Sequence, residues 1–279
     1  MKQLPLVSVG MPVRNGGEYL SKAVRSILDQ TYYNIELIIA DNESSDDTAS
    51  LIEAFAVYDP RIRYFRHEKN IGAIANFDFV LQQATGEYFM WAAYDDTWDS
   101  LWVETLLKGF GEKGVVLSFG KVIAMDERGQ AVRDCEIFSF SASRLRRLVK
   151  YFWMEDYSGK ACLVYGLFRT SFLRKRKPLT AFLGRKCPDM LFVFNCLNYG
   201  LVHVDPSVIF YKRMPPDQLG RTINLSKILN SVFMKDRINY YIGHMSEAEH
   251  VFDRAFLLLL LPLKYIKAVC ANIFRRFWD

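Results

Sequence analysis

The amino-terminal part of the chain alternates between short apolar runs and segments in which apolar residues recur every three or four positions. The short runs predict buried strands at 6–11, 35–40, 61–65 and 88–93. The periodic segments predict helices at 18–30, 45–57 and 71–84. Strands that alternate with helices form crossover units, so we expect an α/β fold with a Rossmann-like, mostly parallel sheet flanked by helices.

The second half of the chain has a weaker pattern. We expect strands at 115–119 and 201–211 and a helix at 189–199. Two further helical stretches, at 226–245 and 249–277, predict a helical extension at the carboxyl end.

This change of pattern predicts a division of the chain. We expect one domain at 1–215, made of halves at 1–110 and 111–215, and a helical tail at 216–279. The chain has 279 residues, of which 51% are apolar and 15% aromatic, so a large core is expected and global disorder is not.

The composition excludes several classes of protein. The first ten residues lack the long apolar stretch of a secretory signal. The five cysteines are odd in number and form no C-x-x-C pair, and the four histidines form no H-E-x-x-H pattern. We therefore expect a reducing, cytoplasmic environment, with neither a disulfide framework nor a zinc site.

The net charge of +5 is unevenly distributed. Residues 140–186 contain twelve basic residues and only two acids. Such a block indicates either an anionic partner, such as phosphate, acidic lipid or nucleic acid, or a solvated basic face. No nucleic-acid-binding motif accompanies the block, so no nucleic-acid partner is expected.

Polar residues follow three of the predicted strands. They are Pro12, Arg14 and Asn15 after the first strand, Asp41, Asn42, Ser44 and Asp46 after the second, and Asp95 and Asp96 after the fourth. In a parallel sheet, ligands bind beyond the carboxyl ends of the strands. The three groups are therefore expected to converge at one edge.

Asp95 and Asp96 are adjacent carboxylates that repel each other. A divalent cation such as Mg²⁺ or Mn²⁺ would relieve this repulsion and could bridge to a diphosphate. The alternative is that both acids cap a helix, since Thr97, Trp98 and Asp99 could open the next one.

Five segments in order resemble one enzyme family, and together they span about residues 6–110. They are PVRN (12–15), SILDQT (26–31), DNESSDDT (41–48), NIGAIAN (70–76) and ATGEY (84–88). This set resembles the family 2 glycosyltransferases, which have a GT-A-type fold. The resemblance implies that 1–110 is the nucleotide-sugar-binding half and 111–215 the acceptor half.

The resemblance also implies roles for individual residues. The donor nucleotide would be bound by Pro12, Arg14, Glu18, Asp41, Asn42, Asn76 and Asp95. Asp95 and Asp96 match the end of the family's Asp-x-Asp signature, and Asp96 would be the more direct ligand of Mn²⁺ or Mg²⁺. The sequence departs from the family at Ala93, where the first Asp is common, and at Arg14, which replaces a frequent Tyr.

An inverting member of this family needs a base for the acceptor hydroxyl. Asp189, at the start of an apolar helix, resembles that carboxylate. The alternative is that Asp189 only caps its helix, and the two roles are compatible. Residues 165–167 would form part of the acceptor wall.

The expected function is thus that of an inverting, metal-dependent glycosyltransferase. Its donor would be a nucleotide-diphosphate sugar, expected to be a UDP-sugar, and its acceptor a saccharide or lipid-linked saccharide in cell-surface polysaccharide biosynthesis. Two alternatives remain: a sugar nucleotidyltransferase of similar fold, and a non-catalytic protein that binds anionic lipid or nucleic acid.

The carboxyl-terminal tail has features of a membrane-surface helix. Its apolar run at 255–263 is too short to cross a bilayer. Beyond it, apolar residues repeat at helical spacing, and Lys264, Lys267 and Arg275 fall on another face. We expect peripheral binding to anionic lipid at the inner face of the cell membrane. The alternative is packing on the catalytic domain or on a second subunit.

Overall fold

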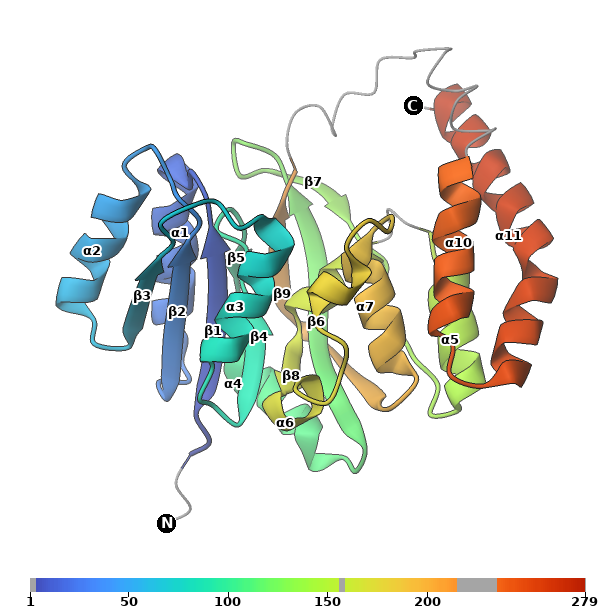
Figure 1. Cartoon of the computed structure of the whole chain (residues 1–279), viewed down its shortest axis with the longest axis horizontal. Helices are drawn as coiled ribbons and strands as arrows, with labels where there is room; N and C mark the ends of the chain where they lie inside the picture. The colour runs from blue at the N-terminus through green and yellow to red at the C-terminus, as the bar shows by residue number, and fades with distance from the viewer. Residues whose placement is uncertain (1–3, 156–158, 215–234, 279) are drawn as a thin grey trace.

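The computed structural model describes residues 4–155, 159–214 and 235–278 (Figure 1). Within them, one mixed sheet runs through the molecule in the order β3-β2-β1-β4-β8-β6-β9-β5, and β7 pairs with β6. Its strands are β1 (Val7–Val13), β2 (Ile35–Asp41), β3 (Ile62–Arg66), β4 (Tyr88–Trp91), β5 (Thr97–Trp98), β6 (Val115–Met125), β7 (Ala131–Asp134), β8 (Leu167–Arg169) and β9 (Leu201–Arg213).

The first half of the sheet is parallel, as the sequence predicts. Strands β3, β2, β1 and β4 pair in parallel, and every residue of β1, β2 and β4 is buried. Burial on both faces explains why these strands read as continuous apolar runs. The helices of this half are α1 (Gly17–Leu28), α2 (Thr48–Tyr58), α3 (Ala73–Gln83) and α4 (Trp102–Lys108).

The second half of the sheet mixes parallel and antiparallel strands, so it does not follow the crossover pattern of the first half. β6 and β9 are parallel, whereas β8, β5 and β7 each run antiparallel to their neighbours. The sequence analysis missed the short strands β5, β7 and β8, which are too short to show a period. The further helical elements are α5 (Arg144–Trp153), α6 (Thr170–Leu173), α7 (Pro188–Leu197) and the 3-10 helices η1 (Gly109–Gly111), η2 (Lys160–Tyr165) and η3 (Leu179–Phe182).

The strand order places a switch point between β1 and β4. The chain moves from β1 through β2 to β3 on one side, and then returns to place β4 on the other side of β1. β4 pairs with β1 only as far as Gly10, opposite Trp91. Pro12, which has no N–H to donate, lies beyond this last pair. Such a switch point is where open α/β sheets bind ligands.

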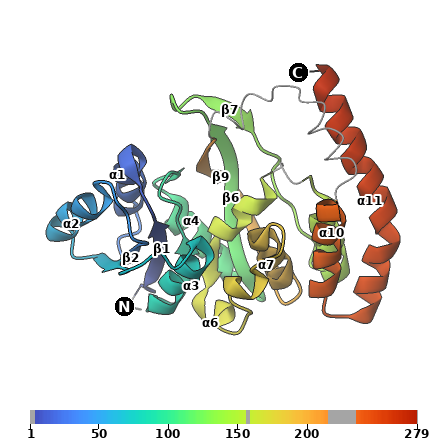
Figure 2. The same cartoon turned by 45° about the horizontal axis from the view of Figure 1, so that its top comes forward.

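The carboxyl-terminal helices α10 (Lys235–Glu247) and α11 (Val251–Trp278) form an antiparallel pair at the far end of the sheet (Figures 1 and 2). α10 packs on α7, and α11 packs on α5. Lys264 is buried and donates to the backbone carbonyls of Trp153 and Met154. It is therefore not a membrane-facing cation, and the tail packs on the rest of the chain.

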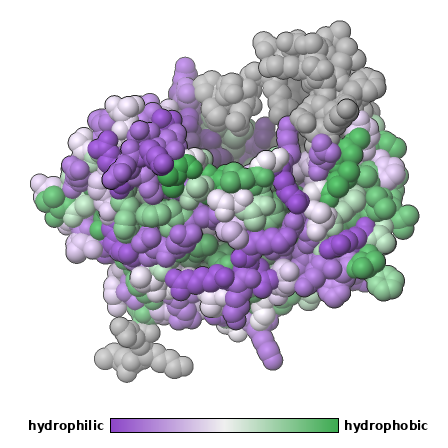
Figure 3. All heavy atoms as spheres, viewed as in Figure 1, coloured by the Kyte–Doolittle hydropathy of each residue, from purple (hydrophilic) through white to green (hydrophobic). Residues whose placement is uncertain are grey.

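The tail still leaves one apolar face in solvent. The exposed residues on α11 include Phe252, Leu259, Leu263 and Ile266. Figure 3 shows hydrophobic side chains gathered over this end of the molecule. Among the described residues, no helix is long and apolar enough to cross a membrane. The expected boundary at 215/216 and residues 226–234 of the expected helix lie outside the described residues.

Candidate active site

Two acidic and two basic side chains lie together where the residues before β5 face the end of β9. Asp96 accepts hydrogen bonds from Lys212 Nζ at 3.0 and 3.3 Å and from the backbone N–H of Arg213 at 2.8 Å. Asp95 accepts a hydrogen bond from the Arg213 guanidinium at 2.8 Å. The repulsion between the adjacent acids is therefore balanced by two cations, neither of which the sequence analysis assigned to the site.

The short strand β5 brings the two acids beside the two cations. It pairs antiparallel with β9, with Thr97 opposite Tyr211. The residues that precede Thr97 therefore lie beside the residues that follow Tyr211, so the acids face the cations. This register also rejects helix capping as the role of the acids, because a strand follows them and α4 begins only at Trp102.

The two acids have different environments. The side chain of Asp96 has no exposure, whereas that of Asp95 is 18% exposed. Burial raises the pKa of Asp96 to about 6, and the neighbouring Lys212 opposes that rise. Burial alone would lower the pKa of Lys212, but the charge of Asp96 raises it overall. At neutral pH, Asp96 and Lys212 form an ion pair in which the carboxylate is buried and the lysine side chain is 28% exposed.

Of the two acids, Asp95 is the more accessible to a divalent cation, and the metal role of both remains a prediction. Carboxylate oxygens are ligands that Mg²⁺ and Mn²⁺ accept, and one or two protein carboxylates are enough when a diphosphate supplies the others. Both oxygens of Asp96 already bind Lys212, while Asp95 reaches the surface. Within the described ranges, no cluster of three or more His, Cys, Asp or Glu side chains is placed to hold a metal.

The loops after β1 and β2 bind each other. The backbone N–H of Asn15 donates to Ser44 Oγ at 2.8 Å, and that of Gly16 donates to Thr48 Oγ1 at 2.7 Å. Asp46 accepts from the backbone N–H of Gly17 at 3.2 Å. These contacts bring together the first two polar groups that the sequence placed at strand ends. They also explain why α2 begins at Thr48 rather than at the expected residue 45.

The expected nucleotide-binding residues divide into two kinds. Arg14 and Glu18 have exposed side chains beside the switch point. Asp41, Asn42 and Asn76 are buried and engaged. Their roles toward a nucleotide remain predictions.

The buried residues of this set support the loops. Asp41 accepts from the Ser44 N–H at 2.8 Å, and Asn42 accepts from the Ile71 N–H at 2.8 Å. Asn76 donates to the carbonyl of Ala40 at 2.8 Å. These bonds join the loop after β2 to the start of α3. All three side chains thus shape the end of β2.

Asp189 lies in the first turn of α7, on the side of the acidic pair. Burial raises its pKa, while backbone N–H groups at the start of the helix and the charge of Lys212 lower it. The charge of Asp189 also acts on the partly buried Tyr165, whose hydroxyl pKa is raised mainly by burial. Asp189 therefore combines a cap-like position with a high proton affinity, and its role as a base remains a prediction.

The basic block does not form one solvated face. Arg147 and Lys160 are buried. Arg147 donates to the carbonyl of Leu197 at 2.9 Å, and Arg174 donates to that of Ala84 at 2.6 Å. Several members of the block thus bind the chain's own backbone.

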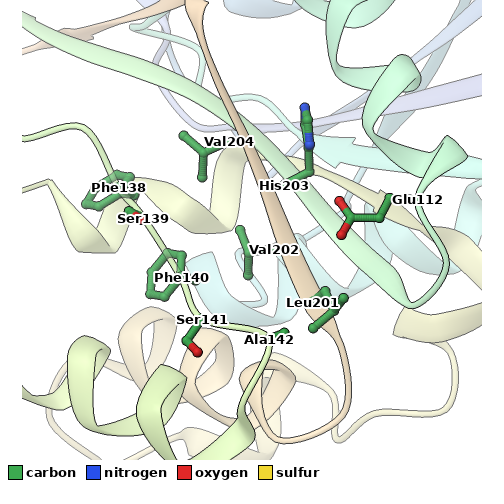
Figure 4. A pocket seen from close by; sticks show the side chains of 10 residues that line it. All are labelled: Glu112, Phe138, Ser139, Phe140, Ser141, Ala142, Leu201, Val202, His203 and Val204. Carbon is green, nitrogen blue, oxygen red and sulfur yellow. The ribbon is translucent and has the colours of Figure 1, made fainter.

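A hollow of about 230 Å³ lies elsewhere, at the first residues of β9 (Figure 4). His203 and Glu112 are at its edge, and Phe138 and Phe140 line its other side. It is at the opposite end of β9 from Lys212, so it is separate from the acidic pair.

Comparisons with known proteins bear on this arrangement. The profile of the family described as Glycosyl transferase family 2 matches residues 8–176. A relative from Campylobacter jejuni, named GalNAc(5)-diNAcBac-PP-undecaprenol beta-1,3-glucosyltransferase, is 29% identical over 188 residues, which are 66% of this chain and 58% of that protein. The matched segments cover between 18% and 58% of the curated relatives' own lengths.

Two solved structures share the fold. The S. aureus TarS 1-349 structure in complex with UDP-GlcNAc has a TM-score of 0.64 at 14% identity, over 98% of this chain and 76% of that chain. The mannosyltransferase PcManGT from Pyrobaculum calidifontis, in complex with GDP-Man and Mn²⁺, has a TM-score of 0.58 at 13% identity, over 100% of this chain and 77% of that chain. The expected GT-A-type fold is confirmed.

Proposed function

Because this chain belongs to glycosyltransferase family 2, we propose that it transfers a sugar from a UDP-sugar to a saccharide or lipid-linked saccharide acceptor in polysaccharide biosynthesis. The observation that carries the proposal is the switch point between β1 and β4. It brings the loops after β1 and β2 and the Asp95–Asp96 pair to one edge. The UDP-GlcNAc complex of the fold relative TarS supports a UDP-sugar.

The reaction would be a direct displacement with inversion. The acceptor hydroxyl oxygen forms a bond to the anomeric carbon as the bond from that carbon to the diphosphate breaks. The hydroxyl proton passes to Asp189, and the nucleoside diphosphate leaves with the bonding electrons. The raised pKa of Asp189 suits it to accept this proton.

A divalent cation would be held by Asp95, with Asp96 behind it. When bound, Mn²⁺ or Mg²⁺ would stabilise the negative charge that develops on the leaving diphosphate. The Mn²⁺ complex of the fold relative PcManGT supports this choice of metal. Lys212 keeps Asp96 ionised and in place, since it binds both carboxylate oxygens.

The acceptor class suggests a position at the inner face of the cell membrane. The Campylobacter jejuni relative is named for an undecaprenol-linked saccharide. The exposed apolar face of α11 suits contact with lipid, since monomeric soluble proteins rarely expose large contiguous apolar patches. We therefore include a peripheral membrane surface among the partners of this chain.

The test is a screen of nucleotide sugars for release of nucleoside diphosphate, with Mn²⁺ and with a chelator. Asp189→Asn should reduce turnover by about 10²–10⁴-fold, with little change in donor affinity. Asp205→Asn, which alters a carboxylate bonded only to its neighbour Ser207 among the described residues, is the matched control. Normal turnover in Asp189→Asn would exclude it as the base. Pyrophosphate release from a nucleoside triphosphate and a sugar phosphate would instead indicate a nucleotidyltransferase.

A further inference from the structure

We propose that Arg213 binds the diphosphate of the donor, and that Asp95 holds the Arg213 side chain in the free enzyme. Donor and cation binding would then exchange partners: Asp95 passes from Arg213 to the metal, and Arg213 passes from Asp95 to the diphosphate. This inference rests on the proposed function and adds a donor-binding residue to it.

Arg213 contacts residues from both sides of the switch point, Tyr19 of α1 and Asp95 beyond β4. Its guanidinium lies 4.1 Å from the centre of the Tyr19 ring, in the first turns of α1, and donates to Asp95 beyond β4. Its Nε is buried and has no hydrogen-bond partner among the described residues. The guanidinium thus keeps an unused donor, and guanidinium groups bind phosphate through two parallel hydrogen bonds.

The charges of the site are compatible with an exchange of this kind. Asp95 and Asp96 are balanced by Lys212 and Arg213, so the free site is neutral. A diphosphate adds one negative charge on each phosphate, and a divalent cation restores the balance. Arg213 binds Oδ2 of Asp95, so a cation held by that carboxylate would lie beside the guanidinium. The repulsion between these positive charges favours the transfer of Arg213 to the diphosphate.

Arg213 can exchange its partner more easily than Lys212 can. The Lys212 ammonium binds both oxygens of a carboxylate with no exposure, and its release would leave a buried charge without compensation. The Arg213–Asp95 pair is partly exposed on both sides, at 19% and 18%. The two cations do not differ in this direction, since Lys212 is 28% exposed, but the carboxylates do: water can reach Asp95 when the pair opens and cannot reach Asp96. Opening the Arg213–Asp95 pair therefore costs less. Lys212 is therefore a positioning residue, and Arg213 is the one that changes partner.

The test uses two variants that move binding in opposite directions, measured by titration calorimetry with Mn²⁺ alone, UDP alone, and UDP with Mn²⁺. Arg213→Met should bind Mn²⁺ alone more tightly, because Asp95 is free, and UDP with Mn²⁺ about ten to a hundred times more weakly. Asp95→Asn should bind Mn²⁺ more weakly and UDP alone more tightly than the wild-type protein does. Arg213→Lys should recover part of the UDP affinity.

A purely structural ion pair predicts a different result. Both variants would then lose UDP affinity, and neither would gain affinity for Mn²⁺ or for UDP alone. That result would refute the proposed exchange of partners. Arg61→Met is the matched control, because Arg61 forms a similar pair with Asp59 away from the switch point. Wild-type protein that binds neither UDP nor GDP with Mn²⁺ would overturn the proposed function itself, and the exchange with it. Circular dichroism would confirm that each variant is folded.

Discussion

The buried carboxylate of Glu36 should be a major determinant of stability, and Glu36→Ala is the change that tests it. Glu36 lies on β2 and accepts four hydrogen bonds, from Ser8 Oγ at 2.5 Å, from Thr85 N and Oγ1 at 2.7 Å each, and from Arg63 at 2.7 Å. Ser8 Oγ in turn accepts from the Gly86 N–H at 2.8 Å. The network joins β1 and β2 to the turn that leads into β4.

The expected loss follows from the donors that the change leaves behind. The Ser8 hydroxyl is wholly buried, and the hydrogen bond from the Thr85 N–H to Glu36 is partly buried although the residue itself is exposed, so each donor loses its acceptor without full access to water. An unsatisfied buried donor costs about 1–3 kcal/mol, which gives about 3 kcal/mol for the pair. Arg63 is partly exposed and recovers its hydrogen bond from water. For a chain of this size, about 3 kcal/mol lowers Tm by about 6–12 °C.

The effect should depend on pH with a defined sign. Burial raises the pKa of Glu36, but the hydrogen bonds from Ser8, Thr85 and Arg63 outweigh it and lower the pKa overall. The ionised form therefore stabilises the fold above the ordinary glutamate pKa, and this contribution is lost as pH falls through the lower folded value. The difference in stability between wild type and Glu36→Ala should shrink below about pH 4.

Thermal and urea unfolding, followed by circular dichroism between pH 3 and 8, would measure both effects. Glu53→Ala, at an exposed glutamate on α2, is the control and should change stability by less than about 0.5 kcal/mol. A loss no greater than that of the control would refute the estimate. A difference that grows as pH falls would refute the sign.

Three other outcomes are expected. Because the pKa of Asp189 is raised, the acid limb of kcat/KM should titrate above the usual aspartate range, and a pH profile with a limb at or below pH 4 would contradict this. Replacing the exposed Leu259 and Leu263 together by serine should reduce flotation with anionic vesicles and leave Tm within a few degrees; unchanged flotation would remove this face from the membrane contact. Gly10→Ala would place a Cβ 2.7 Å from Val80 Cγ2, and overpacking of this kind should cost about 1–3 kcal/mol in urea unfolding, whereas neutral behaviour would mean that α3 yields.

The amino-terminal half was predictable because its signals are local. Strands β1 and β2 are buried on both faces, so each appears in the sequence as a continuous apolar run. Parallel strands end at one edge, so Asp41 and Asp95 could be assigned to a common site without knowledge of any contact. The identities of these residues and their order therefore indicated both the fold and the kind of site.

The partners of the acidic pair were not predictable in this way. Asp96 and Lys212 are separated by 116 positions, and they meet through the two-residue strand β5, which is too short to show a period. In the fold, Asp96 is buried and paired with Lys212, whereas Asp95 is the accessible carboxylate. The preference for Asp96 as the direct metal ligand rested on the family's Asp-x-Asp signature and stays a prediction, because a sequence does not show which of two adjacent acids is buried.

The basic residues show the same limit. Arg147 and Lys264 counted toward cationic faces in the sequence, yet both are buried against carbonyl oxygens of the chain itself. A long cationic side chain can reach water, an anion or a backbone carbonyl, and the residue type does not distinguish them. Composition and periodicity determined which residues enter strands and helices. Only the tertiary structure decided which charges remain available to a ligand, because pairing depends on neighbours that the fold brings from distant positions.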